Sequence, residues 1–264
     1  MLSSRITAGL GLGLLLSPSA AFAGAWTLEA GTGQAIVAGT LSGADRAFDG
    51  AGTLRDIPHY GKFELQGLFE YGATDWFTVM VAPSLQHVDI GPPVDAQRTG
   101  LGYFEAGGRA RLAHWDSWVF SAQATLRVPG TFDTTNPAAI GHNGVEADLR
   151  ALVGYSFALG AFPAFVDVQL AQRFRSAGMP HEFRADATFG IQPAPRWLVL
   201  LQSFNVISEG AGELSPSYEY YKLQASVAYA FTANWSAQVG GFSTIAGRNA
   251  LQENGVLVGA WYRY

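Results

Sequence analysis

Apolar and polar residues alternate with a period of two along most of the chain. Between residues 118 and 128, every second residue from Ser121 to Arg127 is polar, and the residues between them are apolar. The pattern recurs near 62–71, 104–112, 145–151, 166–173, 182–189 and 221–227, and no helical period follows residue 23. Because side chains on a strand point alternately to its two faces, each segment has one apolar and one polar face. The sequence therefore predicts an all-β protein.

The lengths of the strands and of their connections indicate a membrane barrel. The predicted strands run about 10 residues, which crosses a bilayer when the strand is tilted by about 45°. Short turns near 72–75, 113–117, 158–163, 192–196 and 232–234 alternate with long loops near 42–59, 88–98, 129–144, 175–181, 208–217 and 245–254. This alternation is typical of bacterial outer-membrane barrels. We predict a monomeric, transmembrane antiparallel β-barrel of about 12 strands, with both termini on the periplasmic side.

The first 23 residues have the features of an export signal. Arg5 precedes an apolar run that ends near Leu16, and Ala21-Phe22-Ala23 matches an A-x-A cleavage site. The apolar run is too short for a spanning helix. We therefore predict a cleaved signal peptide over 1–23 and a barrel over 24–264. The chain has no Cys, which excludes disulfides, thiol catalysis and Cys-type metal sites.

Aromatic residues recur where strands leave the short turns. A Trp follows a turn at Trp76, Trp118, Trp197 and Trp235, and such rings prefer the membrane–water interface. Alternation predicts an outward-facing aromatic girdle of Trp118, Tyr155, Phe157, Tyr229, Phe231, Trp235, Tyr262 and Tyr264. Trp76 is out of step by one residue, and the strand at 197–207 is too uniformly apolar for its faces to be assigned. The alternative, a soluble sandwich core, gives no use to a charged residue at every second position.

The opposite faces predict a charged lumen. Its predicted lining residues are Lys62, Glu64, Glu105, Arg109, Arg111, Arg127, Glu146, Asp148, Arg150, Asp167, Arg173, Arg184, Asp186 and Lys222. Acids and bases nearly balance on the inward faces, which argues against a strongly ion-selective pore. Two interpretations stay open: a narrow polar passage, or ion pairs that satisfy one another across the barrel and partly fill it. Whether residues 24–33 or the 42–59 loop plug the lumen is also open.

Catalysis and nucleic-acid binding have little support. His59, His87, His142 and His181 fall in or beside predicted loops and His114 falls in a turn, without a Ser at a strand spacing near His142. No metal-binding spacing or phosphate loop is present, so no metal site, catalytic residue or cofactor is predicted. The acidic chain, with a formal charge of −5 and alternating charges, does not favour nucleic acid.

Two segments resemble a known family. GAWTLEAGTGQAIV at 24–37 and KFELQGLFEYGATDWFTV at 62–79 resemble XagA-like outer-membrane proteins, within the broader group that includes the phenol meta-pathway outer-membrane barrels. The resemblance implies uptake of hydrophobic compounds or a biofilm role, and no catalytic residues. GVLVGAWYRY at 255–264 resembles the C-terminal strand recognised by the barrel-assembly machinery.

The favoured function is a narrow passive channel for small or moderately hydrophobic solutes. A non-conducting barrel whose loops act in adhesion or biofilm attachment is the alternative, and a lipid-modifying enzyme comes third. The expected partners are outer-membrane lipids and lipopolysaccharide, the assembly machinery during biogenesis, and a small-molecule solute.

Overall fold

The computed structural model describes residues 24–131, 136–213 and 215–264. The predicted signal peptide lies outside these residues. The strand segments are β1 Gly33–Phe48, β2 Leu54–Thr74, β3 Phe77–Ala82, β4 Ser84–Ile90, β5 Ala96–Leu101, β6 Tyr103–Trp115, β7 Trp118–Pro129, β8 Glu146–Leu159, β9 Phe162–Arg175, β10 Glu182–Ala194, β11 Trp197–Ser208, β12 Glu219–Ala230, β13 Trp235–Arg248, β14 Ala250–Leu251 and β15 Asn254–Arg263.

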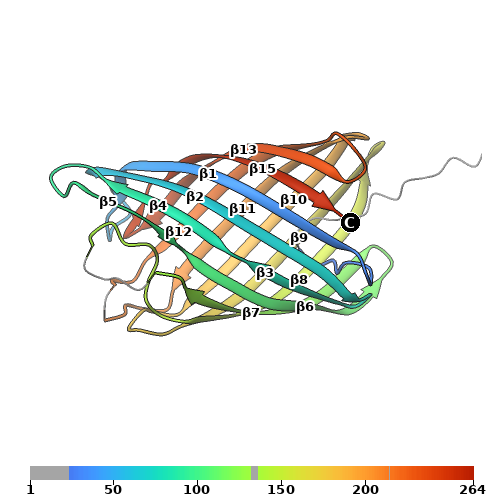
Figure 1. Ribbon diagram of the computed structural model, residues 1–264, viewed down its shortest axis with the longest axis horizontal. Helices are drawn as coiled ribbons and strands as arrows, with labels where there is room; N and C mark the ends of the chain where they lie inside the picture. Colours follow the sequence, from blue (N-terminus) through green and yellow to red (C-terminus); the bar gives the residue numbers. More distant parts are fainter. Residues whose placement is uncertain (1–23, 132–135, 214) are drawn as a thin grey trace, which may run out of the picture.

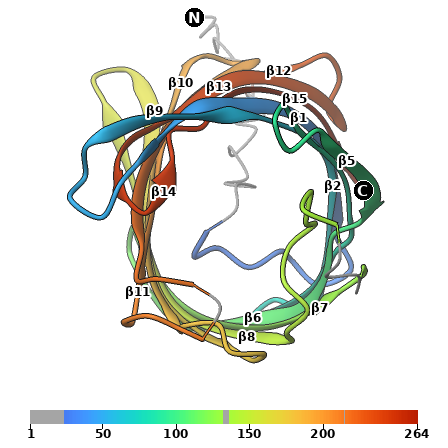
Figure 2. The same cartoon turned by 90° about the vertical axis from the view of Figure 1, so that its left-hand side faces the viewer.

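These segments form a closed antiparallel barrel of 12 wall strands within the described residues, as the sequence predicts. β3 and β4 are two parts of one wall strand, separated at Pro83, which has no N–H to continue the ladder. β5 and β6 are likewise separated at Gly102. The barrel closes where β1 pairs with β2 on one side and with β15 on the other. Figure 1 shows the tilted strands, and Figure 2 shows the ring viewed along its axis.

Burial follows the period-two pattern. On β7, Thr125 is 4% exposed, whereas the next residue, Leu126, is 58% exposed. Across the wall, the exposed large side chains are predominantly apolar, and many buried ones carry charges or hydroxyls. This is the reverse of a soluble protein, because lipid faces the outer surface and polar groups line the interior. Among the described residues, no helix is long and apolar enough to cross a membrane.

The two loops expected at 42–59 and 88–98 are wrong. β1 continues to Phe48 and β2 begins at Leu54, so the first hairpin turn spans only 49–53. β4 continues to Ile90 and β5 begins at Ala96. The loop expected at 245–254 is also mostly strand, because β13 extends to Arg248 and β14 follows. Alternation fades at these ends because strands that extend beyond the membrane meet water on the outside and need no apolar face.

Aromatic rings gather at the short-turn end, where both termini of the barrel lie. Trp118 packs against Tyr155 with ring centroids 4.4 Å apart, and Trp235 packs against Tyr262 at 4.7 Å. Phe157 packs on Tyr155, Tyr264 packs on Tyr262, and Phe231 packs on Tyr229. Trp197 packs on Tyr229 at 4.7 Å, so the strand whose faces were unassigned also contributes a ring. Their position fits the membrane–water interface.

Candidate functional site

Residues 24–32, here called the N-terminal plug, run inside the barrel at its periplasmic end. Figure 2 shows this blue segment crossing the ring of strands before it joins β1. Its backbone is held by the walls through these hydrogen bonds: Ala25 N to Asp167 Oδ2 at 2.7 Å, Ser121 Oγ to Ala25 O, Leu28 N to Thr78 Oγ1 at 2.8 Å, Ala30 N to Asp75 Oδ1 at 2.9 Å, and Gly31 N to Gly72 O at 2.9 Å. The plug therefore spans from β9 across β7 and β3 to the end of β2.

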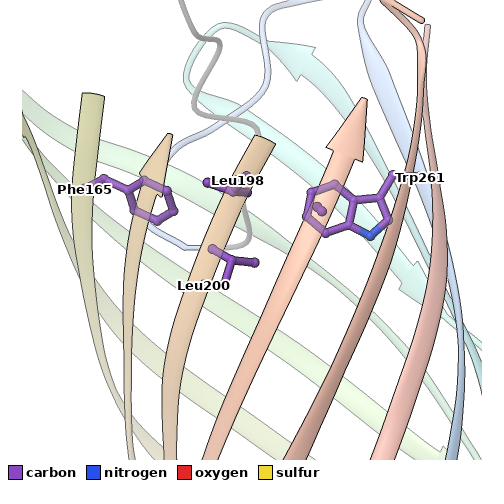
Figure 3. Packing of buried hydrophobic residues seen from close by; sticks show 5 residues of the cluster. Phe165, Leu198, Leu200 and Trp261 are labelled. Carbon is purple, nitrogen blue, oxygen red and sulfur yellow. The ribbon is translucent and has the colours of Figure 1, made fainter. Parts of the chain in front are cut away.

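Trp26 anchors the plug in an apolar pocket of the lumen. Its ring meets Phe165 edge-on, with centroids 5.6 Å apart, and it contacts two buried clusters. The clusters are Phe165, Leu198, Leu200, Ala228 and Trp261 on one side, and Ala25, Val119 and Leu152 on the other. Figure 3 shows the first cluster around one region of the interior, with Phe165 from β9, Leu198 and Leu200 from β11, and Trp261 from β15.

Glycine in the wall makes room for this anchor. A Cβ at Gly154 would lie 2.6 Å from the Trp26 ring, which is closer than non-bonded atoms approach. Where the plug turns into β1, Gly31 has a φ of +81°, a conformation that glycine adopts readily. The sequence left open whether residues 24–33 plug the lumen, and residues 24–32 lie inside it. The pattern that could have identified the plug is a Trp in a segment without strand alternation.

An extensive ion-pair network lines the extracellular half of one wall. We call it the outer network; it joins Glu105, Arg127, Glu146, Asp148, Arg150, Arg173, Arg175, Glu182, Arg184 and Asp186. Arg175 bridges Glu146 at 2.8 Å and Glu182 at 3.1 Å. Arg150 reaches Asp186 at 2.6 Å, and Arg173 reaches Asp148 at 3.0 Å. Five acids face five bases in this set, so the network carries no net charge.

A second charged group lies on the wall where the barrel closes. Glu253 accepts a hydrogen bond from Lys222 Nζ at 2.8 Å and lies 3.6 Å from Lys62 Nζ, which also lies 3.5 Å from Glu64. Desolvation raises the pKa of the Glu253 carboxyl, but the Lys62 and Lys222 ammonium groups outweigh it and hold that pKa at about 2. Glu253 lies between strands at the extracellular end, and its carboxylate stays charged at any physiological pH.

The predicted lining residues are thus distributed over several groups. The structure brings most of them into the outer network or onto the closing wall. Arg109 lies nearer the periplasmic end than the outer network and pairs with the buried Glu70 at 2.9 Å. Arg111 lies half-buried beside a β-bulge. Asp167 lies by the plug. Arg175 and Glu253 were missed because both fall in predicted loops, although Arg175 continues the period of Arg173 by two residues.

The extracellular loop that follows β7 covers part of the mouth. Ala138 and Ile140 are buried against Val88 of β4, and Figure 2 shows this loop bending inside the ring. The Tyr103 hydroxyl donates to the His142 backbone oxygen at 2.9 Å. Desolvation and the nearby Arg175 lower the pKa of His142, which favours its neutral form. The lumen is therefore narrowed at both ends.

The other histidines have structural partners. His59 Nδ1 lies 2.7 Å from Asp45 and His87 Nδ1 lies 2.7 Å from Thr99 Oγ1. His181 Nδ1 accepts the Arg175 backbone N–H at 3.0 Å. Within the described residues, no three His, Asp or Glu side chains gather as metal ligands.

The comparisons with known proteins establish the fold. No protein-family model matches the chain, and no curated protein sequence matches it. The COG4313 outer membrane channel from Pseudomonas putida F1 shares 16% identity with a TM-score of 0.74, over 91% of this chain and 98% of that one. The translocator domain of the autotransporter NalP from Neisseria meningitidis shares 12% identity with a TM-score of 0.56, over 89% of each chain. The NanC porin shares 8% identity with a TM-score of 0.51, over 85% of this chain and 98% of that one. The chain is therefore a β-barrel of the bacterial outer membrane, as its sequence predicts.

Proposed function

We propose that the barrel is a narrow passive channel for small or moderately hydrophobic solutes, and that the N-terminal plug controls its periplasmic exit. The main support for this proposal is the plug, because it lies in the lumen and only a few hydrogen bonds and one aromatic side chain, Trp26, hold it there. No covalent bond or wall strand would have to break for it to leave. Opening the passage in this way would break only the contacts between this short segment and the wall.

The walls of the interior support the solute class. The outer network and the closing wall carry charges that are paired, so they offer hydrogen-bonding groups without a strong field of one sign. Below them, the path meets the apolar side chains around Trp26. A cavity of about 760 Å³ adjoins this region and is lined partly by Leu198, Trp261 and Arg263. A solute with a small polar part and an apolar part meets suitable surface along the whole route.

The other two hypotheses receive less support. Adhesion requires long, accessible loops, but two of the expected loops are hairpin turns and the loop after β7 packs on Val88. Catalysis requires a base beside a nucleophile, and we propose no enzymatic role. We also propose, from the resemblance of the first quarter of the chain, that this protein is related to the XagA-like proteins.

Conductance in planar bilayers tests the channel directly. The comparison is between the wild-type barrel and a variant without residues 26–31, which keeps the predicted cleavage site. We expect low or intermittent current from the wild type and a larger, steadier current from the variant. Heat-dependent migration on gels verifies that both are folded. Folded barrels that never conduct, with or without the plug, would refute the proposal and favour a surface role.

A further inference from the structure

Asp167 is an exception among the acidic side chains of the lumen. Seven other acids on the inward faces each lie within 4.0 Å of an Arg or Lys nitrogen in the described residues: Glu64, Glu70, Glu105, Glu146, Asp148, Glu182 and Asp186. Asp167 is 0% exposed and belongs to none of those ion pairs. Its oxygens accept hydrogen bonds from Gln169 Nε2 and Ala25 N. A buried carboxylate without a cation is costly, so a cationic partner is expected.

The neighbouring cations do not fill this role. Arg109 and Arg150 act on Asp167 through space, but their guanidinium groups are bound by other carboxylates. Arg109 donates to Glu70 at 2.9 Å and Arg150 donates to Asp186 at 2.6 Å. Both acids are themselves buried or nearly so, which keeps each arginine in its own pair.

The position beside Asp167 is the predicted start of the mature chain. Cleavage after Ala23 would make Gly24 the first residue, and its backbone nitrogen would become an α-ammonium. Gly24 is buried, and a Cβ built on it would lie 2.4 Å from Asp167 Oδ2 and 3.0 Å from Oδ1. Its Cα therefore lies directly against the carboxylate, and this contact leaves no space for a side chain at residue 24.

We propose that Asp167 is the binding site for the α-ammonium group that signal-peptide cleavage creates at Gly24. The new charge forms an ion pair with the buried carboxylate, next to the Ala25 hydrogen bond, and fastens the free end of the plug. The plug can form this ion pair only after cleavage, because the uncleaved chain carries a neutral amide at Gly24. The inference rests on cleavage after Ala23 and on the plug contacts, not on conduction.

Amine acetylation of the folded, mature protein in detergent tests this ion pair. The chain simplifies the measurement, because the α-amine competes only with Lys62 and Lys222. An N-hydroxysuccinimide acetate ester reacts with the neutral amine, so an ammonium held by a buried carboxylate reacts slowly. Mass spectrometry of the N-terminal peptide then gives the rate and also identifies the first residue.

The decisive comparison is between Asp167→Asn and Ser121→Ala. Asp167→Asn removes the negative charge but keeps an oxygen for the Ala25 N–H, whereas Ser121→Ala removes a plug hydrogen bond and keeps the charge. We expect the α-amine to react about tenfold faster in Asp167→Asn than in the wild type, because one unit of pKa changes the free-amine fraction tenfold. Ser121→Ala should stay near the wild-type rate.

Three results would overturn the proposal: a mature chain that does not begin at Gly24, equal rates in the wild type and Asp167→Asn, or equal acceleration in both variants. If Asp167→Asn does not assemble, an Ala inserted between Ala23 and Gly24 gives the same test, because it moves the ammonium away while Asp167 remains. Fast acetylation of that variant supports the ion pair, and wild-type protection in it contradicts the ion pair.

Discussion

Replacing Trp26 with Ala measures how firmly the plug is seated. The indole packs edge-on against Phe165 at 5.6 Å and contacts both inner apolar clusters. Truncating a fully buried Trp costs about 3–5 kcal/mol, and an aromatic pair adds about 0.5–1.5 kcal/mol beyond burial. Because Trp26 is only partly buried, we expect the seated state to lose about 2–3 kcal/mol.

A loss of this size changes the plug equilibrium strongly. Since each 1.4 kcal/mol is about tenfold, the ratio of unseated to seated plug should rise by about 30- to 150-fold. The barrel wall should keep its stability, because the wall ladders do not include Trp26. Single-channel recording at moderate salt gives the open fraction, and heat-dependent gel migration gives the folded fraction.

Trp235→Ala is the matched control for this change. The Trp235 indole is 49% exposed and packs on Tyr262. Both belong to the outward-facing aromatic girdle, and neither contacts the plug. We expect its open fraction to match the wild type. If Trp26→Ala opens no more often than the wild type while folded, or if Trp235→Ala opens equally often, the reasoning that Trp26 holds the plug is wrong.

Three further predictions concern the barrel wall and its charges. Ala124→Arg, on the lipid face, should cost about 2–4 kcal/mol in unfolding experiments in lipid vesicles, whereas Gln123→Arg should be tolerated; equal costs would contradict the alternation. The folded pKa of Glu253, about 2, lies below its ordinary value of 4.5, so its stabilising contribution is complete above pH 4.5 and is lost as the pH falls toward 2. In thermal melts across that window the wild type should lose roughly 3 kcal/mol more stability than Glu253→Gln, and equal losses would contradict this role of Glu253. Arg109→Leu leaves the buried Glu70 without its cation and should cost about 3–5 kcal/mol by urea titration, and adding Glu70→Leu should recover most of it; no recovery would mean that the pair is not the cause.

The barrel interior was only partly predictable. Period-two alternation identified the faces of strands such as β7, because each residue's face depends only on its own position along the strand. It could not identify partners. Arg175 and Glu146 are 29 residues apart in the chain and meet through the register of β8 and β9. Charge counting gave a nearly neutral lumen, but it did not show that these side chains are paired into networks.

The sequence by itself determined the barrel, its membrane and the placing of both barrel termini at the short-turn end, because strand length, alternation and turn length are local properties that follow from the thickness and apolarity of the bilayer. Only the tertiary structure decided what the ring encloses. Leu198 and Leu200 face inward, and Trp197 faces outward, because neighbouring strands fix the register of an otherwise uniform apolar run. Trp26 has no alternation around it, so its place in the lumen depends on an apolar pocket that exists only once distant strands have closed into a ring.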